Sequence, residues 1–135
     1  MDSNQMIFEE LLKLKENSYS PYSNFKVACL IYLQDGQVIK GINVENASYP
    51  ATICAERTAL SQVYALGYKK ADIKSLELYT DSEILGSPCG VCRQFISELI
   101  DWSTPISIYS KKGFQIKTNI KELLPYAFEP EQILK

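Results

Sequence analysis

The sequence predicts a three-layer α/β/α fold with a mixed, mostly five-stranded sheet. Segments with helical spacing of apolar residues interleave with short β-rich segments in the order α-β-β-α-β-α-β-β-α. This order favours one sheet with helices on its faces. Two pairs of neighbouring strands are joined by short turns, which makes part of the sheet antiparallel. With 135 residues, 46% of them hydrophobic and 22% charged, we expect residues 1–135 to form a single domain.

The N-terminal third predicts a helix followed by a hairpin. Apolar residues recur at helical spacing over residues 4–17, and a polar, proline-containing segment then ends that helix. Residues 25–33 are apolar and β-rich, which indicates a strand, and residues 38–44 indicate its partner. The Asp35-Gly36 pair between them is a hairpin signal.

The middle of the chain alternates helices with a strand. Residues 53–66 predict a helix, and Gly67 past its end is expected to serve as its C-cap. Residues 75–80 predict a third strand. Pro88 introduces a helix that we expect to reach residue 99 or 100.

The C-terminal part predicts a second hairpin and short helical pieces. Residues 106–109 and 114–117 form the hairpin around a turn at 111–113. Residues 120–124 predict a short helix, which the following proline breaks, and residues 131–134 predict one more turn.

Charge and hydropathy argue against two classes of partner, nucleic acids and membranes. The 14 basic and 16 acidic residues give a net charge of −2, which lacks the basic footprint of a nucleic-acid binder. The N-terminus does not resemble a signal peptide, and no run approaches the roughly 18 apolar residues of a membrane span. We therefore expect a cytosolic protein without membrane or nucleic-acid partners. In a reducing cytosol, the four cysteines are better read as ligands, catalysts or core residues than as disulfides.

Three cysteines carry the strongest chemical signal. Cys54 opens a Cys-Ala-Glu sequence, and Cys89 and Cys92 form a C-x-x-C pair that begins 35 residues later. Three thiols leave one tetrahedral position of a zinc ion open, and an open position distinguishes catalytic from structural zinc. We expect the cysteines at the starts of two helices, where the helix dipole lowers a thiol pKa and favours the thiolate that a metal needs.

Two neighbours of Cys54 complete this hypothesis. Glu56 can border the same helix end without binding the metal, which suits a proton shuttle. Arg57 follows Cys54 by three residues and can share its side of the turn, so we predict that it donates hydrogen bonds to a metal-bound sulfur. The simpler interpretation of Arg57 is a surface arginine.

Other kinds of site stay open at this point. A lone C-x-x-C pair also occurs in redox proteins, Fe–S sites and structural zinc sites. Cys29 lies in an apolar run, which indicates a core residue and not a fourth ligand. A redox pair explains neither Cys54 nor Glu56. Catalytic zinc is the favoured interpretation, with a zinc-stabilised non-catalytic module and a redox protein as alternatives.

The Cys-Ala-Glu and Pro-Cys-Gly-x-Cys motifs together resemble the zinc-dependent nucleoside deaminase superfamily. More narrowly, the chain resembles small cytidine deaminases of the homotetrameric, three-cysteine type. Five segments carry this resemblance in family order through nearly the whole chain: 19–27, 41–49, 53–59, 87–94 and 122–128.

The resemblance implies a catalytic centre with one Zn²⁺ per subunit. Cys54, Cys89 and Cys92 would bind the zinc, and Glu56 would be the proton shuttle. The implied reaction is hydrolytic deamination of cytidine and deoxycytidine to uridine and deoxyuridine, with release of ammonia, in pyrimidine salvage. Nucleic-acid-editing deaminases usually have histidine in place of Cys54. A deaminase of another small aminopyrimidine, of the blasticidin type, remains an alternative.

The resemblance also implies a substrate site. Asn43 and Glu45 would bind the ribose hydroxyls; because they are two residues apart, they point to the same face of a strand. Phe25 would pack against the nucleoside, and the backbone around Ala55 would hold the pyrimidine edge. Phe128 would stack on the base from a neighbouring subunit of the homotetramer.

Two further positions follow from the same resemblance. Tyr49 is expected at a subunit contact. Tyr126 stands where family members often have glycine. Tyrosine adopts a positive φ only at a cost, so we expect the local backbone to differ there.

Overall fold

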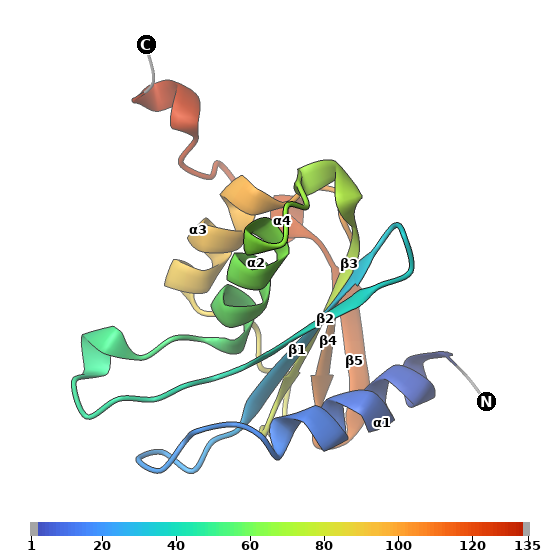
Figure 1. Cartoon of the computed structure of the whole chain (residues 1–135), viewed down its shortest axis with the longest axis vertical. Coiled ribbons are helices and arrows are strands. Elements are labelled where there is room, and N and C mark those ends of the chain that lie inside the picture. The colour runs from blue at the N-terminus through green and yellow to red at the C-terminus, as the bar shows by residue number, and fades with distance from the viewer. Residues whose placement is uncertain (1–2, 134–135) are drawn as a thin grey trace.

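The computed structural model describes residues 3–133 and confirms the predicted class, with helices on both faces of one mixed sheet (Figure 1). The strand order is β2-β1-β3-β4-β5. Strands β3 and β4 pair in parallel, and the other three neighbouring pairs are antiparallel. The strands are β1 (Val27–Leu33), β2 (Val38–Ile42), β3 (Ile73–Thr80), β4 (Ile106–Ser110) and β5 (Gly113–Thr118).

Helix α1 (Ser3–Lys15) covers one face of the sheet. Its buried Leu11 and Leu14 pack in a cluster with apolar and aromatic side chains of β1, β3 and β4. At its end, Lys15 Nζ lies 2.9 Å from Asp81 Oδ1, just beyond β3. This ion pair fastens the helix end to the sheet.

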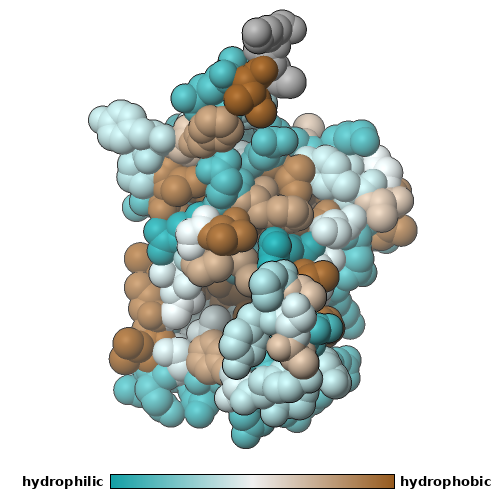
Figure 2. Space-filling model, turned by 90° about the vertical axis from the view of Figure 1, so that its left-hand side faces the viewer, coloured by the Kyte–Doolittle hydropathy of each residue, from teal (hydrophilic) through white to brown (hydrophobic). Residues whose placement is uncertain are grey.

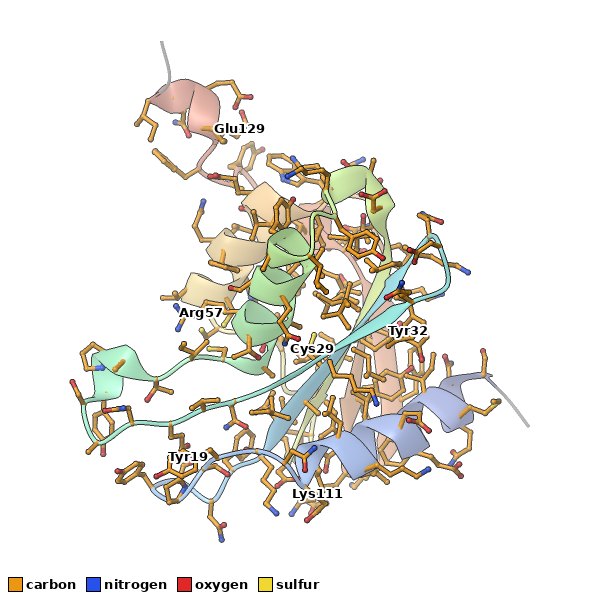
Figure 3. All side chains as sticks on the ribbon, viewed as in Figure 1. Tyr19, Cys29, Tyr32, Arg57, Lys111 and Glu129 are labelled. Carbon is orange, nitrogen blue, oxygen red and sulfur yellow. The ribbon has the colours of Figure 1, made fainter. Side chains whose placement is uncertain are left out.

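Helices α2 (Ala55–Ala65) and α3 (Gly90–Leu99) cover the other face, and α4 (Ile120–Leu123) packs against α3 (Figure 1). The larger apolar cluster fills the space between these helices and the sheet. Cys29 is fully buried in this cluster on β1, which confirms it as a core residue (Figure 3).

The element order is confirmed, and the ends differ from the prediction by a few residues. The first helix ends at Lys15, and the second strand ends at Ile42. Gly67 has φ of 93° directly after the C-cap of α2, as its predicted role requires. The last turn is the 3₁₀ turn Pro130–Gln132; residue 134 of the predicted turn lies outside the described residues.

Tyr126 corrects one expectation. Its φ is 57°, the left-handed conformation that glycine favours, and its side chain is fully exposed. The tyrosine therefore adopts a positive φ in spite of its conformational cost.

Two loops project side by side beyond the start of β1 and the end of β2, residues 16–26 and 43–54 (Figure 1). Tyr19 bridges Val44 in parallel, which holds the loops together. Figure 2 shows the molecule from this side, where apolar side chains stand in several patches among polar ones. In residues 3–133, no helix combines the length and apolar character that a membrane crossing requires.

Candidate active site

The three predicted cysteines meet where two helices begin. Cys54 is the N-cap residue of α2, Cys89 is the N-cap residue of α3, and Cys92 lies in the first turn of α3. Because α2 and α3 pack against each other, their N-terminal ends bring the sulfurs together. All three Sγ atoms lie within 4.8 Å of one another.

This arrangement fits a zinc ion. Three sulfurs at the usual Zn–S distance in a tetrahedral site lie about 3.8 Å apart, so a small inward movement of the thiols suffices. The chemistry of the donors also fits, because thiolates are preferred zinc ligands. Cys29 lies on β1 and is not part of the cluster.

The environment shifts the pKa values of two of the thiols in opposite directions. The pKa of the Cys54 thiol falls to about 6, because Cys92 donates a hydrogen bond to its sulfur and the Arg57 cation lies nearby. The pKa of Cys92 rises, because its proton is held in that hydrogen bond and the thiol is buried. The cluster therefore already stabilises thiolate character at one sulfur.

Glu56 lies in the first turn of α2 beside the cysteines. Its side chain is 3% exposed. Burial raises the pKa of this carboxyl to about 7, partly offset by hydrogen bonds from its own backbone and from Cys92. A carboxyl with this environment can gain and lose a proton near neutral pH.

A pocket of about 240 Å³ opens over the cysteines. Its floor is the end of the sheet, and its walls are the segments that lead into α2 and α3. The structure brings Phe25, Asn43, Ala55 and Glu56 into this pocket together with the three cysteines, as the sequence predicts. The other lining residues are Val27, Thr52, Ile53, Leu78, Thr80, Ser87 and Pro88.

Asn43 is held firmly at the end of β2. Its Oδ1 accepts a hydrogen bond from Val27 N at 3.0 Å and another from the Ser18 hydroxyl. Its Nδ2 donates to Phe25 O at 2.9 Å. The amide therefore fixes the Phe25–Val27 backbone, and its second N–H can still donate to a ligand.

Glu45 and Tyr49 lie in an adjoining pocket of about 370 Å³, and Thr52 lines both pockets. The Glu45 carboxylate accepts hydrogen bonds from Tyr22 N and Ser23 N at 3.0 and 3.1 Å, and from the Ser23 hydroxyl. The Ser23 hydroxyl is the main reason that the pKa of Glu45 is lowered. Within one chain, this carboxylate holds the 22–23 loop.

Phe128 does not reach the cysteine pocket of its own chain. It is 52% exposed and lines a separate hollow with Trp102 and Glu129. Its carbonyl accepts a hydrogen bond from Gln94 Nε2 at 3.1 Å. The C-terminal segment that carries Phe128 and Glu129 stands away from the sheet (Figure 3).

Arg57 lies near the N-terminal end of α2 (Figure 3). Its Nη2 donates to Thr52 O at 3.0 Å, which braces the segment before Cys54. Its Nε is buried and has no hydrogen-bond partner among the described residues. The guanidinium also contributes to the lowered pKa of Cys54, so its position agrees with a role beside the sulfur.

Part of the pocket is not predicted by the sequence motifs. Thr80 lies on the floor and Ser87 and Pro88 on one wall, and none had been assigned to the site. Ser87 and Pro88 directly precede the Cys-x-x-Cys pair, which was the available signal. Thr80 ends the strand whose neighbour β4 is parallel, and ligands often bind beyond the carboxyl ends of such strands.

The chain matches a known family profile. Residues 1–104 match the family described as "Cytidine and deoxycytidylate deaminase zinc-binding region". A cytidine deaminase of Halalkalibacterium halodurans is 39% identical over 129 residues, which are 96% of each chain. One from Sporosarcina psychrophila is 38% identical over 133 residues, 98% of this chain and 96% of that protein.

Solved structures agree. The crystal structure of a cytidine deaminase from Burkholderia pseudomallei superposes with a TM-score of 0.88 at 37% identity, covering 95% of this chain and 100% of that one. That from Mycobacterium leprae gives a TM-score of 0.70 at 35% identity, covering 92% and 99%. The similarity therefore extends over nearly the whole chain in both sequence and structure.

Proposed function

Because the chain belongs to the cytidine and deoxycytidylate deaminase family, we propose that it hydrolyses cytidine and deoxycytidine to uridine and deoxyuridine with release of ammonia. One observation carries this function. The pocket places a buried carboxylate, Glu56, beside a cluster of three thiols that is suited to a catalytic metal. A purely structural metal site has no chemical need for that carboxylate.

Cys54, Cys89 and Cys92 would hold one zinc ion per chain. The three thiols account for three of the four tetrahedral positions. When bound, zinc supplies a Lewis acid that makes water nucleophilic at neutral pH. The dipoles of α2 and α3 and the charge of Arg57 offset the negative charge of three thiolates.

Glu56 would move the protons of the reaction. It accepts a proton from the attacking water and delivers it to ring N3, which makes C4 electrophilic. The water oxygen forms a bond to C4. Glu56 then takes the remaining proton from that oxygen and passes it to the exocyclic amine. A C4–O double bond forms as the C4–N bond breaks, and ammonia leaves. Overall, one water is consumed and one ammonia released for each cytidine.

The pocket would orient the nucleoside with residues from helix α2 and from the loops before β1 and after β2. Phe25 offers an apolar ring to the nucleoside, and Ala55 offers backbone to the pyrimidine edge. Asn43 would donate its second amide N–H to a ribose hydroxyl. Glu45 would bind a ribose hydroxyl from the adjoining pocket, which shares Thr52 with the first.

The site would be completed by other copies of the chain in a homotetramer. Phe128 and Tyr49 support this, because both aromatic side chains are exposed and neither lines the cysteine pocket of its own chain. We place Phe128 over the base of a neighbouring subunit and Tyr49 at a subunit contact. The thiol-rich site suits a reducing compartment, so the cytosol is the proposed location and pyrimidine salvage the proposed role.

Glu56→Gln tests the proposed chemistry. Glutamine has nearly the same shape but cannot shuttle protons, so turnover of cytidine should fall by about 10²–10⁴-fold while zinc stays bound. Turnover and zinc content are measured on one sample. The exposed Glu98→Gln is the control and should keep both. Near-normal turnover in Glu56→Gln would remove Glu56 from the reaction.

A further inference from the structure

Arg93 joins three segments around the pocket although it does not line the pocket itself. It directly follows Cys92 in the first turns of α3. Its Nε donates to Pro88 O at 2.7 Å, its Nη2 to the Ser87 hydroxyl at 2.8 Å, and its Nη1 to Leu123 O at 2.6 Å. Each of the three nitrogens of the planar guanidinium thus donates a hydrogen bond to an uncharged oxygen, and the rigid shape of the group fixes these oxygens relative to one another.

Two of these bonds hold a wall of the pocket. Ser87 and Pro88 line the pocket, and Cys89 follows them directly. On the side of the sheet, the same segment is packed tightly: a Cβ added at Gly86 would lie 2.3 Å from Thr80 Oγ1. The wall is therefore fixed between β3 on one side and the Arg93 guanidinium on the other.

The third bond extends to the C-terminal segment. Leu123 is the last residue of α4, and its carbonyl accepts from Arg93. The adjacent Gln94 donates to Phe128 O. Two consecutive residues of α3 therefore connect the metal-binding helix with both ends of the segment that presents Phe128.

We propose that Arg93 is a positioning residue for the deamination, an inference that rests on the proposed function. It fixes the Ser87–Pro88 wall and the start of α3 relative to Cys54 and Glu56. A misplacement of about 1 Å in a catalytic site can cost about 10²-fold in rate. Loss of the three Arg93 hydrogen bonds should therefore lower turnover even when the fold and the metal remain.

The distinction from ordinary structural support comes from a matched control. Tyr64 on α2 donates from its hydroxyl to Leu99 O at 2.6 Å, at the far end of α3. Tyr64→Phe removes a side-chain hydrogen bond to a carbonyl of this helix, away from the pocket. A merely structural Arg93 would behave like Tyr64: stability would fall and kcat would not.

The experiment compares Arg93→Met, Arg93→Lys and Tyr64→Phe with the unmodified chain. The measurements are zinc per chain, melting temperature, kcat and KM for cytidine, and the thiolate absorption of the Co²⁺-substituted proteins. We expect Arg93→Met to keep its zinc and lose about 10–100-fold in kcat with a smaller change in KM. Arg93→Lys should recover part of the loss, because a single ammonium can reach only some of the three oxygens. Tyr64→Phe should keep kcat within twofold.

A kcat within twofold of normal in Arg93→Met, or a loss that added zinc fully restores, overturns the proposal. If Arg93→Met does not fold, Arg93→Lys decides: a threefold or larger loss of kcat at full zinc supports positioning, and an unchanged kcat refutes it. An unmodified protein that is inactive on cytidine overturns the proposed function instead. The cobalt spectrum then tests Arg93 alone: a band shift in Arg93→Met but not in Tyr64→Phe supports it, and unchanged spectra refute it.

Discussion

At the scale of single residues, the two N-cap cysteines stabilise their helices less than usual N-cap residues would, and their side chains belong to the proposed metal site. Serine, threonine, asparagine and aspartate are the usual N-caps, because their oxygens accept from free backbone N–H groups. Neither Cys54 nor Cys89 makes a cap hydrogen bond with its side chain. Both sulfurs instead turn to the cluster with Cys92. The absence of these cap hydrogen bonds lowers the stability of each helix by about 1 kcal/mol.

Cys89→Ser should therefore separate metal binding from stability. Serine is a good N-cap residue, so the metal-free variant should be at least as stable as the metal-free parent. It should nevertheless lose zinc, because a hydroxyl is a poor zinc ligand. Metal analysis and thermal melts of the stripped proteins measure both effects. Cys29→Ala, in the core away from the cluster, is the control that keeps its metal; full zinc in Cys89→Ser would remove Cys89 from the ligand set.

The buried Glu77 should make the stability of the fold depend on pH, apart from any effect on the proposed active site. It is buried on β3, and its Oε2 has no hydrogen-bond partner among the described residues. Burial raises its pKa to about 7 against a normal 4.5, with partial compensation from Ser107 and Lys117. Because the pKa of Glu77 is higher in the folded than in the unfolded chain, the folded chain holds this proton more tightly. The contribution of Glu77 to the free energy of unfolding is therefore complete below about pH 4.5. It is lost as the pH rises through about 7.

Glu77→Gln should remove this dependence. Its gain in unfolding free energy over the parent should grow from near zero at low pH to at most about 3 kcal/mol above pH 7. Chemical denaturation at several pH values measures the difference, in which the contribution of the other buried carboxyl, Glu56, cancels. Glu98→Gln, on the surface, should show no such trend. A constant difference across the pH range would contradict the assignment to Glu77.

At the scale of elements, the segment between β3 and α3 is packed closely against the end of β3. Gly86 faces Thr80 so closely that an added methyl group would overlap the Thr80 hydroxyl. The reason for glycine here is therefore close approach and not an unusual φ. Because Ser87 and Pro88 follow directly and line the pocket, any displacement at Gly86 passes into the pocket wall.

Gly86→Ala should displace this wall and lower kcat/KM for cytidine by about tenfold or more, with a loss of about 1–3 kcal/mol in stability from overpacking. Adding Thr80→Ala removes the overlapping atoms and should recover much of both losses. Gly90→Ala serves as the control, since its Cβ would meet nothing within 4 Å. No rescue in the double variant would show that the wall is not held by this contact.

The elements themselves could be predicted because their signals are local. Helical spacing over 53–66 and the Asp35-Gly36 turn each depend on a few neighbouring residues, and both gave elements in the expected places. The cysteine cluster could also be predicted, since its members start two helices. The contact of Gly86 with Thr80 could not, because it joins a loop to a strand end through packing alone.

At the scale of the whole molecule, a single chain leaves its proposed site open. The pocket contains the thiols, Glu56 and Asn43, whereas Phe128 lies elsewhere on the surface. The placement of Phe128 in a neighbouring subunit rests on family resemblance, because no local pattern in the sequence predicts it. A contact between copies depends on shapes that only assembled chains create.

Phe128→Ala tests this assembly. If Phe128 stacks on the base in a neighbouring site, its loss should raise KM for cytidine about tenfold while zinc stays bound. Light scattering on the unmodified protein should give the mass of four chains. Tyr126→Ala is the control, because Tyr126 is exposed on the same segment and shares no proposed role in binding. A fully active monomer would contradict the shared site.

The most direct test of the central claim combines turnover and metal analysis on one sample. Purified protein is incubated with cytidine, the loss of substrate absorbance is followed, and zinc is measured on the same preparation. We predict equal amounts of uridine and ammonia at about one zinc per chain. One zinc per chain with no turnover of cytidine or deoxycytidine would contradict the account. It would leave Cys54, Cys89 and Cys92 as a metal site whose chemistry lies elsewhere.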